Sequence, residues 1–250
     1  ALPKIVEAVG SEIEVMFDGG IRSGLDLDAD GSPDLDPSRI AYTGHSLGAS
    51  YGTLFSAVDP AIPISALLSG GGSTVSSFRL SPAFRPVLVQ YLGAVAPGLL
   101  NAGAGFDTNQ PLRYEPVRVN TVKGAIELQD AFEKVEWIIS PGDPLNFAPH
   151  LVSSTLPGLP IKRVFFQFAI GDQTLVNPTA TALVLAANLR ESTRIYRTDL
   201  ARAANPQLPV NPHSFQLDIV NQANQPFALA AQSQFVGFLA SGGTRIPDIN

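Results

Sequence analysis

The sequence predicts an α/β fold in which a mostly parallel sheet is flanked by helices. Short apolar runs with strand character alternate with longer segments of helical spacing, and this alternation is typical of parallel strands joined by crossover helices. At one strand-to-helix junction, residues 39–51 contain the pattern Gly-x-Ser-x-Gly. The chain has 250 residues, of which 45% are hydrophobic, so we expect one domain with a sizeable core and an insertion.

The elements follow one another in a regular order. Residues 2–17 have apolar side chains at helical spacing and are followed by Asp18, Gly19 and Gly20, which predicts an amphipathic helix that ends there. A short apolar strand from residue 39 then leads to a turn at Ser46. By the same patterns, the further strands are expected at 61–70, at 164–170 and from 193, and the further helices at 47–58, 124–139, 178–190 and 225–240.

The regular alternation stops between the strands at 61–70 and 164–170, where Gly and Pro interrupt the apolar patches. We therefore expect a cap or lid over residues 73–160, inserted into a core made of residues 1–72 and 161–250. Such a cap can bind an acyl chain. The candidate lining residues are Leu88, Tyr91, Leu92, Leu99 and Leu100. The alternative is that these side chains form only the cap's own small core.

The composition excludes several classes of function. The formal net charge of −6 argues against nucleic acid as a partner, since no basic stripe is present to neutralise phosphates, and equally against an anionic membrane surface. No apolar run is long enough to span a bilayer, and the first residues lack the pattern of a secretion signal. The absence of cysteine excludes disulfides, thiolate metal sites and a cysteine nucleophile, but it leaves the compartment open.

Ser46 is the candidate nucleophile. Gly44 and Gly48 complete the Gly-x-Ser-x-Gly pattern, in which the serine lies on a sharp turn where bulky neighbours would collide with the backbone. The Leu47 N–H, at the start of the following helix, is the candidate donor to an oxyanion, because a helix N-terminus has partial positive charge. The alternative is a chance occurrence of the pattern in a chain rich in glycine and serine.

His213 is the candidate base, because it lies in a loop after the last predicted strand and can reach across the sheet edge to the serine. His150 is the other possible base. His45 adjoins the nucleophile, so we expect its side chain to support the turn. The alternative for His213 is an ordinary surface-loop histidine.

Asp172 is the candidate acid that orients the base, because it follows the predicted strand at 164–170 and gives the chain order Ser, Asp, His. Asp143 is its main rival. The alternative for Asp172 is a role in capping the helix that begins near Asn177. Neither alternative accounts for all three placements together.

An acidic loop precedes the strand that leads to Ser46, and its spacing is typical of calcium ligands. Gly31 stands at the tight turn, as in an EF-hand-type loop, but Pro37 replaces the bidentate glutamate, so later aspartates would have to complete the shell. The candidate ligands of a structural Ca²⁺ are Asp26, Asp28, Asp30, Ser32, Asp34 and Asp36. The alternative is a solvated acidic turn.

Together, these residues resemble the α/β-hydrolase superfamily on its lipase and esterase side, and bacterial lipase-like proteins in particular, some of them virulence factors. The resemblance extends from Ser23 to Phe215, and its markers are SGLDLDADGSPDLDPSRI before GHSLG, then GDPLNFAPHL, GDQTLVNP and NPHSF. It implies a secreted or cell-surface bacterial protein, with no cofactor for the chemistry and with a small-molecule or lipid ester as substrate.

The chain departs from this family at its front. Family members have several strands before the serine, and a loop among those strands donates the second oxyanion N–H, whereas here the serine comes at position 46. Either an upstream segment or a second chain completes the sheet, or a loop such as Gly70–Ser73 supplies the donor. An open strand edge also favours self-association.

The function expected from the sequence is that of a serine carboxylic-ester hydrolase, an esterase or lipase acting through an acyl-enzyme on Ser46. Acyl transfer or peptide cleavage by the same three residues is the enzymatic alternative. A calcium-stabilised, non-catalytic binding module is the other alternative.

Overall fold

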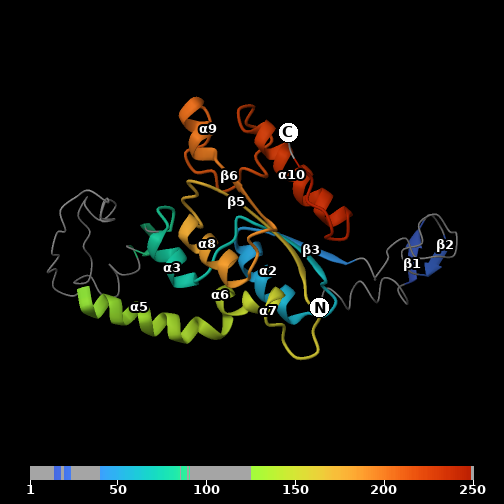
Figure 1. Cartoon of the computed structure of the whole chain (residues 1–250), viewed down its shortest axis with the longest axis horizontal. Coiled ribbons are helices and arrows are strands. Elements are labelled where there is room, and N and C mark those ends of the chain that lie inside the picture. Colours follow the sequence, from blue (N-terminus) through green and yellow to red (C-terminus); the bar gives the residue numbers. More distant parts are fainter. Residues whose placement is uncertain are drawn as a thin grey trace.

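The core of the molecule is a four-stranded parallel sheet, as predicted. The computed structural model describes residues 14–17, 20–23, 40–84, 86–88, 90 and 125–248. The four strands are β3 (Ala41–His45), β4 (Ile64–Leu68), β5 (Arg163–Ala169) and β6 (Thr193–Tyr196). They lie in the order β3-β4-β5-β6, and every neighbouring pair is parallel (Figure 1). Within the described residues, β3 and β6 form the two edges.

The helices connect and cover these strands. Those with described bounds are α2 (Leu47–Val58), α3 (Thr74–Leu80), α5 (Ala125–Ile139), the 3₁₀ turn η3 (Ser140–Gly142), α6 (Pro144–Phe147), α7 (Pro149–Val152), α8 (Asn177–Ala186), α9 (Thr198–Ala204) and α10 (Gln225–Ala240). The helices predicted at 47–58, 124–139 and 225–240 are confirmed. The helix predicted at 178–190 ends at Ala186. Two residues later, Asn188 adopts the left-handed backbone conformation, with φ 56°, which asparagine tolerates and which commonly ends a helix.

Alternate side chains of the central strands enter two different cores. Leu67 of β4 and Phe166 and Phe168 of β5 pack with buried residues of α2 and α8. On the opposite face, Phe165 of β5 packs against Phe238 of α10, with a ring-centroid distance of 5.6 Å. The sheet is therefore covered on both faces, by α2 and α8 on one side and by α10 on the other (Figure 1), which accounts for the nearly continuous apolar sequence of β5.

The chain between β4 and β5 contributes to the core as well as to the predicted cap. Ala148 and Leu151, in and beside α7, are fully buried in the cluster formed by α2, α8 and the sheet. Farther out, α5 contacts α3, and the Arg79 guanidinium lies 5.1 Å from the ring centroid of Phe132. The assignment of residues 73–160 to one cap stays a prediction, with part of that range packed on the core.

The prediction of a helix over residues 2–17 is wrong for its last four residues. Glu14–Phe17 is strand β1, which pairs antiparallel with β2 (Gly20–Ser23). Phe17 is opposite Gly20, and the two residues between them in the sequence are Asp18 and Gly19. Asp-Gly between two strands is among the strongest signals for a tight hairpin, and here it prevails over the helical spacing. The rest of the predicted helix lies outside the described residues.

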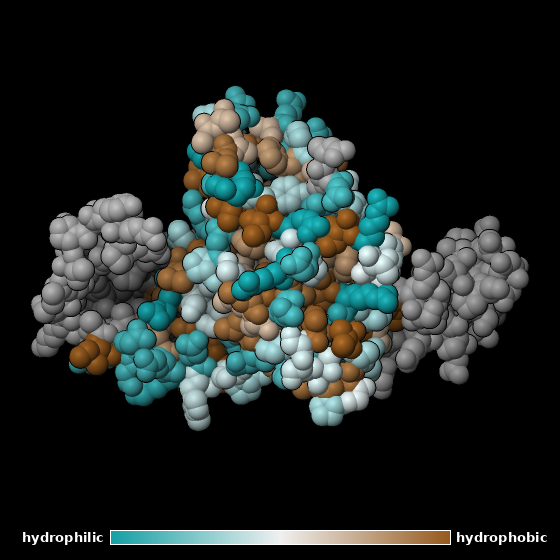
Figure 2. Space-filling model, viewed as in Figure 1, coloured by the Kyte–Doolittle hydropathy of each residue, from teal (hydrophilic) through white to brown (hydrophobic). Residues whose placement is uncertain are grey.

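The surface of the described core mixes apolar and hydrophilic residues side by side (Figure 2). On α2, Leu47, Tyr51 and Val58 are among the exposed large apolar side chains. None of the helices in the described ranges has the length and apolar character needed to cross a membrane.

Candidate active site

Ser46 lies at the junction of β3 and α2 in a backbone conformation that few residues other than glycine adopt. Its φ is 58° and its ψ is −121°. Hydrogen bonds on both sides hold it there: its N–H donates to the Leu68 carbonyl at 2.9 Å, and its carbonyl accepts from the N–H groups of Ala49 and Ser50. Strain of this kind costs about 1–3 kcal/mol and persists where surrounding structure enforces it. It turns the serine side chain out of the strand-to-helix turn.

Only one of the two glycines in the pattern is tightly enclosed. A Cβ on Gly44 would lie 2.4 Å from the Gly48 carbonyl oxygen, so the close approach of β3 and α2 requires glycine there. The same carbonyl oxygen accepts a 2.6 Å hydrogen bond from the Tyr42 hydroxyl, which fixes the first turn of α2 against the strand. A Cβ on Gly48 would have its nearest neighbour at 3.8 Å, which is ordinary contact.

Ser46, His213 and Asp172, which we call the triad, form one continuous chain of hydrogen bonds. His213 Nε2 lies 2.7 Å from Ser46 Oγ, and His213 Nδ1 lies 2.7 Å from Asp172 Oδ2. With its proton on Nδ1, the imidazole donates to the carboxylate, and Nε2 accepts from the serine hydroxyl. The three side chains therefore have the arrangement in which a serine can lose its proton to a histidine.

Asp172 is held by the turn that follows β5. Its Oδ1 accepts from the N–H groups of Thr174 (2.8 Å) and Leu175 (3.0 Å), which leaves Oδ2 for His213. The Asp172 side chain is 1% exposed and that of His213 is 11% exposed. A carboxylate so enclosed keeps its orientation and shields its bond to the imidazole from water.

The rival residues are used elsewhere. Asp143 is buried and caps two helix starts, since it accepts from Leu145 N–H (2.9 Å) and from Thr74 N–H (2.7 Å). His150 is bonded at Nδ1 to the Ser154 carbonyl (2.5 Å), on the surface. Neither side chain contacts Ser46.

His45 lies beside the base as well as beside the nucleophile. Its Nε2–H donates to the backbone carbonyl of His213 at 3.0 Å, and the two imidazole centroids are 5.0 Å apart. Burial lowers the pKa of His45 below its ordinary value of 6.5, and the hydrogen bond to the His213 carbonyl acts in the opposite direction. His45 thus connects the turn at Ser46 with the loop of His213.

Leu47 follows Ser46 as the first residue of α2, and no acceptor in the described part of the chain takes its N–H. This N–H is free to meet an oxyanion. The loop Gly70–Ser73 differs: Gly71 N–H donates to Ser50 Oγ (3.1 Å) and Gly72 N–H to the Thr179 carbonyl (3.3 Å). Two of the N–H groups that this loop offers as second donors are therefore already bonded within the fold.

Several predicted site residues lie outside the described residues, namely Asp26, Asp28, Asp30, Ser32, Asp34, Asp36, Tyr91 and Leu92. Leu88 is described and half-buried, and its N–H donates to the Phe84 carbonyl. In the ranges that the structure describes, no group of three or more His, Asp or Glu side chains is arranged to hold a metal ion.

Asn211 is a site residue that sequence reasoning missed. Its Oδ1 accepts from the N–H of His213 (3.2 Å) and from the N–H of Gln173 (3.0 Å), the residue after Asp172. The one available signal was its place two residues before His213 in the NPHSF segment, since asparagine commonly bonds the backbone two residues on.

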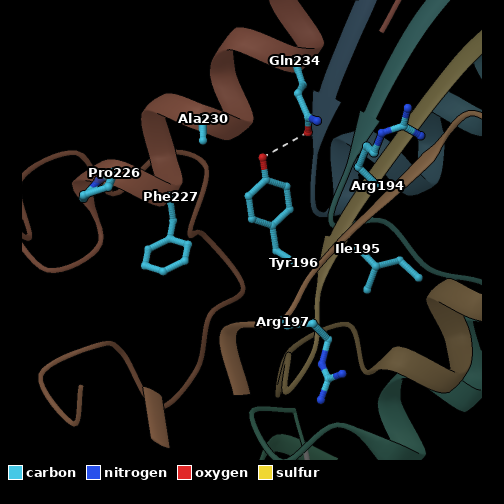
Figure 3. Close-up of a pocket in the computed structure, with 8 residues that line it drawn as sticks. All are labelled: Arg194, Ile195, Tyr196, Arg197, Pro226, Phe227, Ala230 and Gln234. Carbon is cyan, nitrogen blue, oxygen red and sulfur yellow. Dashed lines mark hydrogen bonds between the residues drawn. The ribbon is translucent and has the colours of Figure 1, made fainter. Parts of the chain in front are cut away.

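A separate hollow of about 510 Å³ lies between β6 and α10 (Figure 3). Arg194, Tyr196, Phe227 and Gln234 are among its lining residues, and the Tyr196 hydroxyl donates to Gln234 Oε1 at 3.0 Å. Burial raises the pKa of Tyr196 to about 12, although the nearby Arg194 charge acts in the opposite direction. No triad residue lines this hollow.

The order of the triad residues along the chain matches the order of the strands that they follow. Ser, Asp and His follow β3, β5 and β6 in that chain order, so the observed fold class is the mostly parallel, helix-flanked sheet of the α/β-hydrolase type. A family model for FMN-dependent dehydrogenase matches residues 1–28, a range that contains none of the triad. No curated protein matches the chain.

Two kinds of solved structure are similar to this chain. Acylaminoacyl peptidase from Pyrococcus horikoshii has 10% sequence identity over 90% of this chain and 26% of its own, with a TM-score of 0.47 for an orthorhombic crystal form. The uncomplexed form of the same peptidase has 10% sequence identity over 91% of this chain and 28% of its own, with a TM-score of 0.48. Acetyl xylan esterase 1 from Thermoanaerobacterium sp. JW/SL YS485 has 16% identity over 78% of this chain and 59% of its own, with a TM-score of 0.35. The chain thus spans about a quarter of the peptidase chains.

Proposed function

We propose that this protein is a serine hydrolase that cleaves carboxylic esters through an acyl-enzyme on Ser46. The observation that supports this proposal best is the unbroken path Ser46 Oγ, His213 Nε2, His213 Nδ1, Asp172 Oδ2, with both hydrogen bonds at 2.7 Å. A serine hydroxyl is a weak nucleophile until a base takes its proton, and this path provides the base together with the group that orients it.

In the proposed reaction, Ser46 Oγ attacks the ester carbonyl carbon while its proton moves to His213 Nε2. The carbonyl oxygen becomes an oxyanion next to the Leu47 N–H, and Asp172 stabilises the imidazolium. The bond to the alkoxy group then breaks as His213 gives its proton to the departing alcohol. His213 Nε2 then takes a proton from a water molecule as the water attacks the carbonyl carbon of the acyl-enzyme. The bond to Ser46 Oγ breaks, and His213 returns the proton to that oxygen, which releases the acid and restores Ser46.

The acyl chain of the substrate is proposed to contact the segment 73–160. The start of that segment is bonded to the turn that carries Asp172, because Ser81 Oγ–H and Ala83 N–H both donate to the Gln173 carbonyl, at 2.8 and 3.1 Å. Leu88 lies one helical turn after Phe84 on the same stretch. Together with Tyr91 and Leu92, Leu88 remains our candidate for apolar contact with the substrate.

The first experiment is hydrolysis of a short and a long p-nitrophenyl ester by the purified chain, with Ser46→Ala as its control and with calcium present. Activity that is lost in Ser46→Ala supports the proposal, and the ratio of the two rates separates esterase from lipase behaviour. A folded chain that hydrolyses neither ester overturns it as stated.

A fluorophosphonate probe separates an enzyme from a binding module. Labelling of Ser46 that disappears in His213→Ala supports a reactive serine with a working base, whereas no labelling of folded protein supports a non-catalytic module. Acyl transfer and peptide cleavage use the same acyl-enzyme, so product analysis with alcohol or amine acceptors, and with a peptide, distinguishes them from ester hydrolysis.

A partner strand on β3 is proposed to complete the oxyanion site. The β3 edge opposite β4 is unpaired within the described residues, and the exposed apolar side chains of α2 include Leu47 and Tyr51. An upstream segment or a second copy of the chain would cover this surface and bring a second N–H donor, whose absence costs about 10²–10³ in turnover. Sedimentation across a concentration series tests the second copy: a monomer at all concentrations excludes it.

A structural Ca²⁺ in the acidic loop is a further proposal, and it rests on the spacing of the aspartates in the sequence. Chelation is expected to lower the melting temperature, and Asp28→Ala is expected to abolish that effect. Melting that does not respond to a chelator would rule out the calcium site while leaving the hydrolase proposal intact.

A further inference from the structure

We propose that Asn211 and His45 are positioning residues that hold His213 in place by its own backbone, an inference that rests on the proposed function of the triad. Asn211 Oδ1 accepts the His213 N–H at 3.2 Å, and His45 Nε2–H donates to the His213 carbonyl at 3.0 Å. Side chains therefore bond the backbone of His213 on both sides of its Cα. We call this pair of contacts the backbone clamp.

Asn211 joins the base to the acid. Besides the His213 N–H, its Oδ1 accepts the Gln173 N–H at 3.0 Å, and its Nδ2 donates to Thr174 Oγ1 at 2.9 Å. Gln173 and Thr174 directly follow Asp172 in the sequence. One amide side chain thus bonds both the turn that carries the carboxylate and the loop that carries the imidazole, so their separation depends on it.

His45 joins the base to the nucleophile. It precedes Ser46 in the chain, and its ring lies 5.0 Å from that of His213, centroid to centroid. Because burial lowers the pKa of His45, the ring donates its hydrogen bond in the neutral state and adds no positive charge beside His213 when that residue takes up a proton. A charged ring at this distance would oppose proton transfer from Ser46.

The clamp matters because the two hydrogen bonds of the triad leave little room for displacement. A misplacement of about 1 Å can lower a rate by about 100-fold. Removing one side of the clamp is therefore expected to lower kcat by about 10- to 100-fold. The value of KM should change little, because neither residue is proposed to touch the substrate.

The asparagine side of the clamp is tested with Asn211→Ala and Asn211→Asp. Aspartate keeps the oxygen that accepts from His213, and its second oxygen can accept from the Thr174 hydroxyl, so it is expected to recover most of the kcat lost in the alanine variant. Asn205→Ala is the matched control, since Asn205 Oδ1 accepts the Gln207 N–H (3.1 Å) in the same kind of turn outside the site. Equal kcat for Asn211→Ala and Asn205→Ala would overturn the inference.

The histidine side is tested with His45→Leu, which removes the N–H donor, and with His45→Gln, which retains one. The leucine variant is expected to lose kcat and the glutamine variant to recover part of it. His150→Leu is the matched control, because that imidazole also bonds a backbone carbonyl but lies away from the triad. A leucine variant at His45 with the kcat of the wild type would overturn this side of the clamp.

A spectroscopic measurement separates failure of the clamp from failure of the proposed function. The proton on His213 Nδ1 that faces Asp172 should give a downfield NMR signal, whether or not the protein hydrolyses an ester. Loss of this signal in folded Asn211→Ala, with retention in Asn205→Ala, supports the clamp even if the wild type proves inactive, and an unchanged signal overturns it. If Asn211→Ala fails to fold, the same comparison is made between the two His45 variants.

Discussion

Gly44 and Gly48 are equivalent in the Gly-x-Ser-x-Gly pattern but not in the structure, and replacing each with alanine separates them. A Cβ on Gly44 would lie 2.4 Å from the Gly48 carbonyl oxygen, about 1 Å inside the ordinary contact distance of 3.4 Å. That carbonyl is already held by the Tyr42 hydroxyl at 2.6 Å. Relief of the clash requires the first turn of α2 to move away from β3, and Ser46 to move with it.

Overpacking of this kind costs about 1–3 kcal/mol, so Gly44→Ala is expected to lower the free energy of unfolding by that amount. The accompanying shift of Ser46 should lower its labelling rate by up to about 100-fold. Gly48→Ala meets nothing closer than 3.8 Å and replaces a helical glycine, which favours stability by up to about 1 kcal/mol. Urea unfolding and the rate of fluorophosphonate labelling measure both effects. Equal stabilities and equal labelling rates for the two variants would refute the geometry of this turn.

Three further predictions concern stability and titration. Because burial lowers the pKa of His45 in the folded chain, the His45 imidazole takes up a proton more readily in the unfolded chain as the pH falls below 6.5. Urea unfolding across this range should therefore show the free energy of unfolding falling more steeply with decreasing pH in the wild type than in His45→Gln. Parallel curves would contradict this. Because the pKa of Tyr196 is raised to about 12, Tyr196→Phe should leave the tyrosinate absorbance at about pH 11 nearly unchanged, whereas a loss close to one tyrosine would refute its burial. Leu151→Ala should cost about 2–5 kcal/mol because Leu151 is fully buried, while Trp137→Ala, at 81% exposed, should cost less than about 0.5 kcal/mol; equal melting shifts would place Leu151 outside the core.

Most of the sheet could be predicted from the sequence, because its strands are short apolar runs bounded by turn residues. The strand predicted at residues 164–170 is observed as Arg163–Ala169, and its side chains alternate between two cores. The helix predicted at 2–17 is wrong over Glu14–Phe17, where apolar residues at helical spacing precede the Asp18-Gly19 hairpin signal. A local turn preference decides such a case, since a segment as short as Glu14–Phe17, with three apolar residues, fits either periodicity.

The meeting of Ser46, Asp172 and His213 could be anticipated because each follows a strand, and the carboxyl ends of parallel strands lie at one edge of a sheet. The contacts that set the distances between these three residues could not be predicted from the sequence. Asn211 acts through two backbone N–H groups, one of which lies 38 residues away in the sequence, and no residue pattern records such a contact. The unequal need for glycine at 44 and 48 likewise depends on how closely β3 approaches α2.

The distances along the chain between the triad residues have a consequence for biosynthesis. Ser46 is separated from His213 by 167 positions, whereas His213 and Asp172 are 41 positions apart. Proteins are made from the N-terminus, and contacts between distant segments form late. The serine turn therefore emerges from the ribosome long before His213 is synthesised, and in the proposed mechanism a chain that ends before residue 213 lacks the base that activates Ser46. In the proposed mechanism, serine reactivity therefore requires the last strand and the loop that carries His213, so labelling of Ser46 would report that synthesis and folding of this part are complete.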